Sequence, residues 1–236
     1  MTRDHRRARK QKAVNINHKT EKKPKPIRKD FFTRSKKPEI LDTSKPRKVK
    51  SYARSQNLAA VIEAILSPTS KEDEQLVLIK HHKSYDEPFL VQKGNRDTIL
   101  TDPKFYAGPK NSLTEIHTHP KGSPPSDADF WTLLTQPAVR GSEVLTPQDT
   151  VFILQKTSKT PNAANITKDE FDTSWNESIA EGKSIYDEMK QNGEEMPLGA
   201  NGDKDRAIYI LIDQKMAEKY GLTWQVARKD DFLVAE

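Results

Sequence analysis

The stretch His117-Thr-His119-Pro120-Lys-Gly-Ser-Pro-Pro-Ser126-Asp-Ala-Asp129 decides how the fold and function of this chain are interpreted. Alternate residues of an extended segment point to the same side, so His117 and His119 can direct two imidazoles at one point. Asp129, in the first turn of a following helix, supplies a third ligand once the proline-rich loop folds back. Three protein ligands that leave a fourth position for water are the arrangement of a catalytic zinc site. The stretch therefore predicts that His117, His119 and Asp129 bind Zn²⁺.

Other classes of protein with paired histidines are excluded by residues that the chain lacks. Metal-dependent amidohydrolases, phosphoesterases of the polymerase-and-histidinol type and cupins need further histidines after the first pair, and none follows His119. Zinc deaminases of nucleobases need a cysteine-rich second motif, and the chain contains no cysteine. The pair His81-His82 is a poor chelate, because adjacent strand residues point to opposite faces, and we interpret both side chains as facing solvent.

The two halves of the stretch, H-x-H-P and S-x-x-D, resemble the signature of the JAMM (MPN-plus, JAB domain) metallopeptidases. The resemblance implies a zinc-dependent hydrolase of peptide or isopeptide bonds, in which a metal-activated water is the nucleophile. It implies that His117, His119 and Asp129 hold the zinc and that Ser126 donates a hydrogen bond to the oxyanion. The interval from His119 to Ser126 is one residue shorter than in eukaryotic members, which leaves Ser123 as an alternative. Bacterial and phage JAB-type domains, including toxin-type ones, are the most similar branch.

The same family signature includes an upstream glutamate that acts as the general base. It takes a proton from the metal-activated water and gives it to the leaving amine. In the family it lies at the start of the first strand, and Glu74 begins the run Glu-Gln-Leu-Val-Leu-Ile. Glu74 is therefore the first choice, followed by Glu72 and by Glu63. Val77 stands where the family has a glycine.

The spacing of apolar residues predicts an α/β (α+β) domain with a central sheet flanked by helices. Helical spacing is found at residues 55–66, 127–134, 167–192 and 216–220. Short apolar runs predict strands at residues 74–79, 88–91, 113–119, 151–155, 207–212 and 222–227. The pattern leaves parallel and antiparallel pairing open. The resemblance covers about residues 55–155 and implies the JAMM, cytidine-deaminase-like version of such a sheet.

Charge divides the chain into a basic tail and an acidic remainder. Residues 1–50 contain 19 lysines and arginines and 5 acidic residues, whereas residues 51–236 contain 21 and 29. The first part also lacks apolar periodicity, so we expect a disordered basic tail at 1–50. Residues 51–236 then form the JAMM-like domain, with a core at 55–156 and a C-terminal extension at 157–236. Such a tail attracts nucleic acid or an acidic protein, or is simply solvated without a specific partner.

The resemblance implies a protein or peptide substrate. Deubiquitinase-like cleavage of a ubiquitin-like conjugate and a toxin-type or processing role both fit it, and a catalytically inactive JAMM-like scaffold tethered by the basic tail is the alternative. No run approaches eighteen apolar residues, so no membrane partner is expected. The first residues lack the apolar segment of a secretory signal. We therefore expect a cytoplasmic protein, a nuclear one in a eukaryote, or a toxin delivered by another route.

Overall fold

The structure is a computed structural model that describes residues 47–48, 73–83, 86–95 and 98–228. Several predictions lie outside these residues: the helix at 55–66, nearly all of the basic tail, and the alternative bases Glu63 and Glu72.

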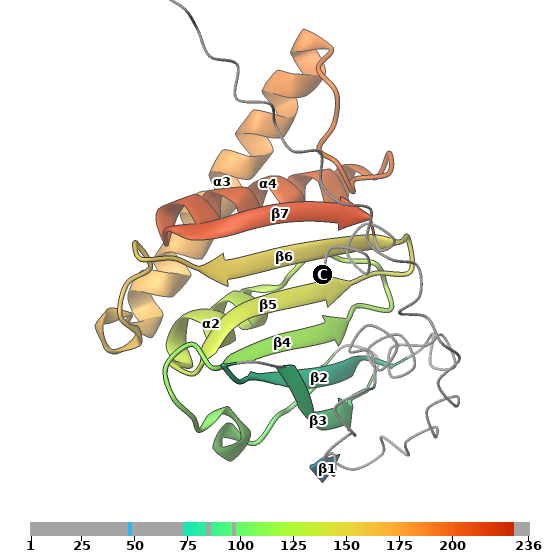
Figure 1. The fold of residues 1–236 in the computed structure, drawn as a ribbon. Helices are drawn as coiled ribbons and strands as arrows, with labels where there is room; N and C mark the ends of the chain where they lie inside the picture. The colour runs from blue at the N-terminus through green and yellow to red at the C-terminus, as the bar shows by residue number, and fades with distance from the viewer. Residues whose placement is uncertain (1–46, 49–72, 84–85, 96–97, 229–236) are drawn as a thin grey trace, which may run out of the picture. The chain divides into compact units, whose positions relative to one another are not determined.

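A mixed sheet forms the centre of the described part (Figure 1). Its strands lie in the order β1 (Arg47–Lys48), β3 (Asp86–Lys93), β2 (Gln75–His81), β4 (Leu113–Thr118), β5 (Val139–Leu145), β6 (Thr150–Lys156) and β7 (Leu222–Arg228). All neighbours pair antiparallel except β4 and β5, which are parallel.

The parallel pair explains why the predicted metal ligands meet. Parallel neighbours need a crossover connection, and here it consists of the loop after β4 and helix α2 (Asp127–Thr135). The chain leaves the carboxyl end of β4, turns through the proline-rich loop and immediately starts α2. The first turn of the helix is thereby brought next to the carboxyl end of β4.

The helices of the described part cover one face of the sheet. Helices α2 and α4 (Lys204–Lys219) lie against it, and α3 (Lys168–Asn192) packs on α4 (Figure 1). Short 3₁₀ helices occur at Pro103–Tyr106 (η3) and Ala163–Asn165 (η4). The core between these layers joins strand and helix residues, among them Leu76, Leu78, Leu113, Val139, Leu154, Phe130, Leu133, Leu134, Phe171, Ile212 and Met216. Burying each such side chain contributes about 1.5–3 kcal/mol.

Most of the predicted elements are confirmed, as is the mixed α/β architecture with helices flanking a central sheet. The runs at 74–79, 88–91, 113–119, 151–155 and 222–227 correspond to β2, β3, β4, β6 and β7. The helices predicted at 127–134 and 167–192 are α2 and α3.

The strand predicted at 207–212 was wrong, because these residues lie inside α4. The helix is held between α3 and the sheet, so it buries residues on several sides and loses the one-sided pattern that identifies a surface helix. Gly182 of α3 permits the close approach: a Cβ there would lie 2.8 Å from the side chain of Ile212. The resulting run of apolar residues is easily mistaken for a buried strand.

Strand β5 was not predicted. Its sequence, Val-Arg-Gly-Ser-Glu-Val-Leu, contains few strongly strand-forming residues. Gly141 lies where the backbone of β6 approaches closely, since a Cβ would be 3.1 Å from the carbonyl oxygen of Leu154. Pairing with β4 and β6, and not local preference, makes this segment a strand.

A search for membrane-spanning segments, confined to the described residues, finds no helix with the length and apolar character to cross a bilayer.

Candidate metal centre

The backbone at the end of β4 fixes the two histidines. His117 pairs with Leu76 of β2 on one side and with Val144 of β5 on the other. His119 follows the last residue of the strand, and its backbone N–H donates to the carbonyl oxygen of Leu145 at 2.9 Å. Both side chains are buried, with 3% and 6% of their surface exposed. The sheet thus holds both imidazoles in place with little of their surface exposed.

Asp129 is held by the capping box of α2. Ser126 is the N-cap residue, and its hydroxyl accepts from the backbone N–H of Asp129. In return, the Asp129 carboxylate accepts from the backbone N–H of Ser126 at 2.6 Å and from its hydroxyl at 2.8 Å. Both bonds involve Oδ2. The capping box therefore orients the Asp129 carboxylate even without a bound metal.

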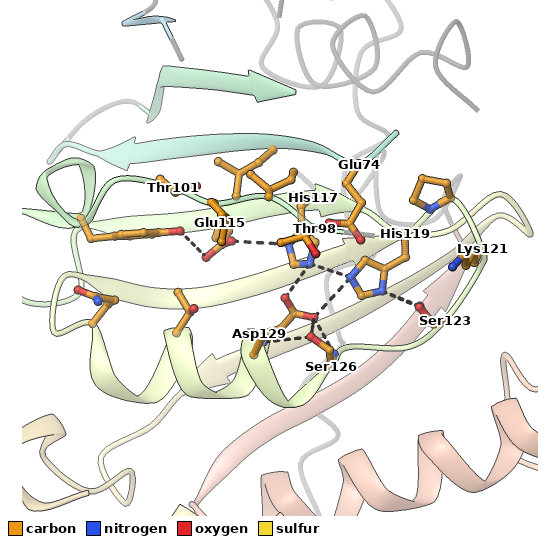
Figure 2. A pocket seen from close by; sticks show the side chains of 18 of the residues that line it. Glu74, Thr98, Thr101, Glu115, His117, His119, Lys121, Ser123, Ser126 and Asp129 are labelled. Carbon is orange, nitrogen blue, oxygen red and sulfur yellow. Dashed lines mark hydrogen bonds and ion pairs between the residues drawn. The ribbon is translucent and has the colours of Figure 1, made fainter. Parts of the chain in front are cut away.

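The three predicted ligands converge, as the sequence indicated (Figure 2). The Nε2 atoms of His117 and His119 are 3.2 Å apart. Oδ1 of Asp129 lies 3.1 Å from Nε2 of His117, and Oδ2 lies 3.4 Å from Nε2 of His119. One ligand atom from each residue falls within 4.8 Å of the others. This group has the residue types and spacing needed to hold a metal ion.

Hydrogen bonding of His119 also favours metal binding. Its Nδ1 lies 3.0 Å from the carbonyl oxygen of Ser123 and 3.1 Å from that of Pro124. Carbonyl oxygens only accept hydrogen bonds, so Nδ1 carries the proton. In the neutral ring, the lone pair is then on Nε2, which faces the other two ligands.

The charges of His117 and Asp129 stabilise each other. Burial alone would raise the pKa of the Asp129 carboxyl, but His117 and His119 together outweigh burial and hold this pKa well below its ordinary value. Burial alone would lower the pKa of His117, but Asp129, with smaller contributions from the charges of Glu115 and Glu74, outweighs burial and the pKa is raised to about 9. Without a metal, the two residues form a buried ion pair. A metal ion would take the place of the proton on His117.

The triad lines a cavity of about 550 Å³, and Glu74 lies on its wall. Figure 2 shows the Glu74 side chain extending from the start of β2 toward the two histidines. Its backbone is fixed by hydrogen bonds with Gly94 and Asn95. The negative charge of Glu74 is among the causes of the raised pKa of His117. Glu74, the first choice for a general base, therefore lies in the same cavity as the candidate metal ligands.

The two candidate oxyanion donors also line this cavity. The Ser126 hydroxyl is bonded to Asp129, as described above. The Ser123 hydroxyl lies 3.0 Å from Nδ1 of His119, on the side of the ring away from the other ligands. Gly122, with φ 78°, forms the turn of this loop. Ser126 is thus beside the candidate metal position, whereas Ser123 supports His119.

Two residues of the site, Glu115 and Tyr106, were not predicted from the sequence. Glu115 shares a strand face with His117 and is buried, and burial raises the pKa of its carboxyl to about 7. The Tyr106 hydroxyl donates to Oε2 of Glu115 over 3.4 Å. A charged residue in the apolar strand, two positions before His117, was the available signal for Glu115. Tyr106 comes from η3, and only the fold brings it here.

The prediction that His81 faces solvent was wrong. Its Nδ1 lies 2.6 Å from Oδ1 of Asp86, its Nε2 lies 2.7 Å from Oγ1 of Thr114, and the side chain is largely buried. His82 contacts Glu87 and is partly buried. These histidines connect the ends of β2, β3 and β4.

Comparison of the chain with protein-family models, with curated proteins and with solved structures finds no match.

Proposed function

We propose that the chain is a JAMM-like, zinc-dependent hydrolase of peptide or isopeptide bonds. One observation carries the proposal: His117, His119 and Asp129 converge on the wall of a cavity that also contains Glu74. A pure scaffold has no need for three such side chains, two of them buried, next to a further carboxylate in one cavity.

Two imidazole nitrogens and one carboxylate oxygen are a donor set that suits zinc among the common ions. The capping box of α2 and the carbonyl contacts of His119 hold two of these donors in place. A zinc ion bound there would polarise the carbonyl of the scissile bond and lower the pKa of a water molecule.

Glu74 is the proposed general base. Its carboxylate would accept a proton from the attacking water and transfer it to the nitrogen of the leaving amine. Its place on the cavity wall supports this role. Glu74 directly precedes β2, His117 and His119 lie at the end of β4, and Asp129 is in the first turn of α2, so the sheet and this helix hold the distance between the base and the candidate ligands.

Ser126 is the proposed donor to the substrate carbonyl oxygen. It lines the cavity directly beside Asp129. Its hydroxyl has one proton, which it now shares with the Asp129 carboxylate. Donation to a substrate therefore requires the hydroxyl to turn from Asp129 toward the bound carbonyl.

The first test measures zinc by mass spectrometry in the purified protein, beside the variant His119→Ala. We expect about one zinc per chain in the wild type and loss of zinc in the variant. Absence of zinc from both proteins would reject the hydrolase and favour the scaffold.

The second test screens linear peptides and isopeptide-linked ubiquitin-like conjugates, with Glu74→Gln as the control. The expected result is hydrolysis by the wild type and a loss of about 10²–10⁴-fold in Glu74→Gln with zinc retained. Equal rates in the wild type and Glu74→Gln would remove Glu74 from the mechanism.

A further inference from the structure

The Nδ1 atom of His117 is buried and has no hydrogen-bond partner among the residues that the structure describes. The other ring nitrogen of His117, Nε2, faces His119 and Asp129. If Nε2 binds a metal, the ring proton must be on Nδ1, because a neutral imidazole has a single N–H. A buried N–H without an acceptor costs about 1–3 kcal/mol. The arrangement therefore calls for an acceptor close to Nδ1.

Glu115 is placed to be that acceptor. Its Oε1 lies 3.9 Å from Nδ1 of His117, and 7% of the residue is exposed. The proximity follows from strand geometry, because residues two apart point to the same face. Figure 2 shows the Glu115 carboxylate on the side of the His117 ring away from His119.

Tyr106 holds Glu115 from its other side. The Tyr106 hydroxyl donates to Oε2, so the carboxylate lies between a phenol and an imidazole. Tyr106 is itself buried and belongs to the core cluster. Glu115 is not within the group of ligand atoms that surround one point, which separates it from the direct ligands.

We propose that Glu115 is a positioning residue that accepts a hydrogen bond from Nδ1 of His117 and so orients Nε2 toward the metal, with Tyr106 as its anchor. The proposal rests on the proposed zinc site. Carboxylates that accept from the second nitrogen of a metal-binding histidine fix the ring and make it a stronger ligand, and their loss typically costs 10–100-fold in metal affinity.

The test is zinc affinity, measured by competition with a chromophoric chelator on the full chain. Glu115→Gln keeps the shape of the side chain but removes its charge, and we expect the dissociation constant for zinc to rise about 10–100-fold. Tyr106→Phe should weaken zinc binding less, because Glu115 remains. The matched control is Glu143→Gln on β5, whose register with Ile116 places it on the opposite face; it should bind as the wild type does.

Two further measurements distinguish positioning from a general loss of structure. The unfolding midpoint of the metal-free protein should not fall in Glu115→Gln, because only a weak contact of a buried carboxyl is removed. In the zinc-loaded wild type, NMR should detect a slowly exchanging proton on Nδ1 of His117, and its exchange should be faster in Glu115→Gln.

Wild-type zinc affinity in Glu115→Gln, together with lost binding in His119→Ala, would overturn the role of Glu115 and leave the metal site intact. Absence of zinc binding by the wild type would overturn the site itself and this inference with it.

Discussion

Asp213 is a buried carboxylic acid outside the candidate site. It lies in α4 with none of its surface exposed. Neither carboxylate oxygen has a hydrogen-bond partner within the described part of the chain. Burial raises the pKa of this carboxyl well above its ordinary value, and the negative charge of Asp129 adds to the effect. Asp213 is therefore neutral in the folded protein at a pH where it ionises in the unfolded chain.

This difference sets the sign of a pH effect on stability. A raised folded-state pKa stabilises the fold fully below the unfolded pKa of about 3.9, and the contribution is lost as the pH rises toward the folded-state pKa. Asp213→Asn cannot ionise, so we expect it to exceed the wild type in free energy of unfolding by about 1–3 kcal/mol at pH 7.5. The difference should shrink as the pH falls to 4.

Denaturant unfolding at a series of pH values measures this effect. Asp205→Asn provides the control, because Asp205 is an exposed acidic residue in the first turn of the same helix. If Asp213→Asn and the wild type show the same pH dependence, Asp213 is not the group responsible.

Ser126 both caps α2 and bonds the candidate ligand Asp129. Ser126→Ala removes the N-cap and one of the hydrogen bonds to the Asp129 carboxylate. We expect a loss of about 0.5–2 kcal/mol in the free energy of unfolding, together with about tenfold weaker zinc binding. Ser126→Thr keeps the hydroxyl and should restore most of both. Thermal unfolding and chelator competition measure the two quantities.

Helix α3 supplies the matched control for this prediction. It starts with the same type of capping box, formed by Thr167 and Glu170, which is not part of the candidate site. Thr167→Ala should lower stability by a similar amount and leave zinc affinity unchanged. Weaker zinc binding in Thr167→Ala would show that any loss of helix stability disturbs the site.

The elements that carry the candidate metal ligands could be predicted because their signals are local. Alternation aligns His117 with His119, and acidic residues after Ser126 indicate a helix start. The secondary structure of α4 and β5 could not be predicted in this way, because it depends on contacts with segments far along the chain. Helix α4 is enclosed by α3 and the sheet, and β5 is held by pairing on both sides. The role of Tyr106 was hidden for the same reason.

At the scale of the whole molecule, residues 157–228 join the sheet that carries the candidate site. β7 pairs with β6 over the length of both strands, and α4 packs against β7. The hydroxyls of Thr157 and Thr160 donate to the carbonyl oxygen of Gly221 at 2.6 and 3.0 Å, which fixes the start of β7. Trp175 of α3 contacts Phe130 of α2 edge-to-face. The segment after residue 156 thus stabilises the helix that presents Asp129.

This arrangement predicts that a chain of residues 1–156 does not fold, although it contains every residue of the candidate site. Removing β7 leaves β6 with an unpaired edge, and removing α3 and α4 exposes the core around Phe130 and Leu154. We expect no cooperative thermal transition by circular dichroism and no bound zinc. A chain of residues 47–236 is the control and should keep the cooperative transition and the bound zinc. It retains the cavity residues identified in the described part, which lie between Glu74 and Gln136, and every described strand from Arg47 onward. A cooperative transition with one zinc per chain in residues 1–156 would mean that the site does not need the segment after residue 156. Loss of both from residues 47–236 would instead mean that the basic tail contributes to the fold.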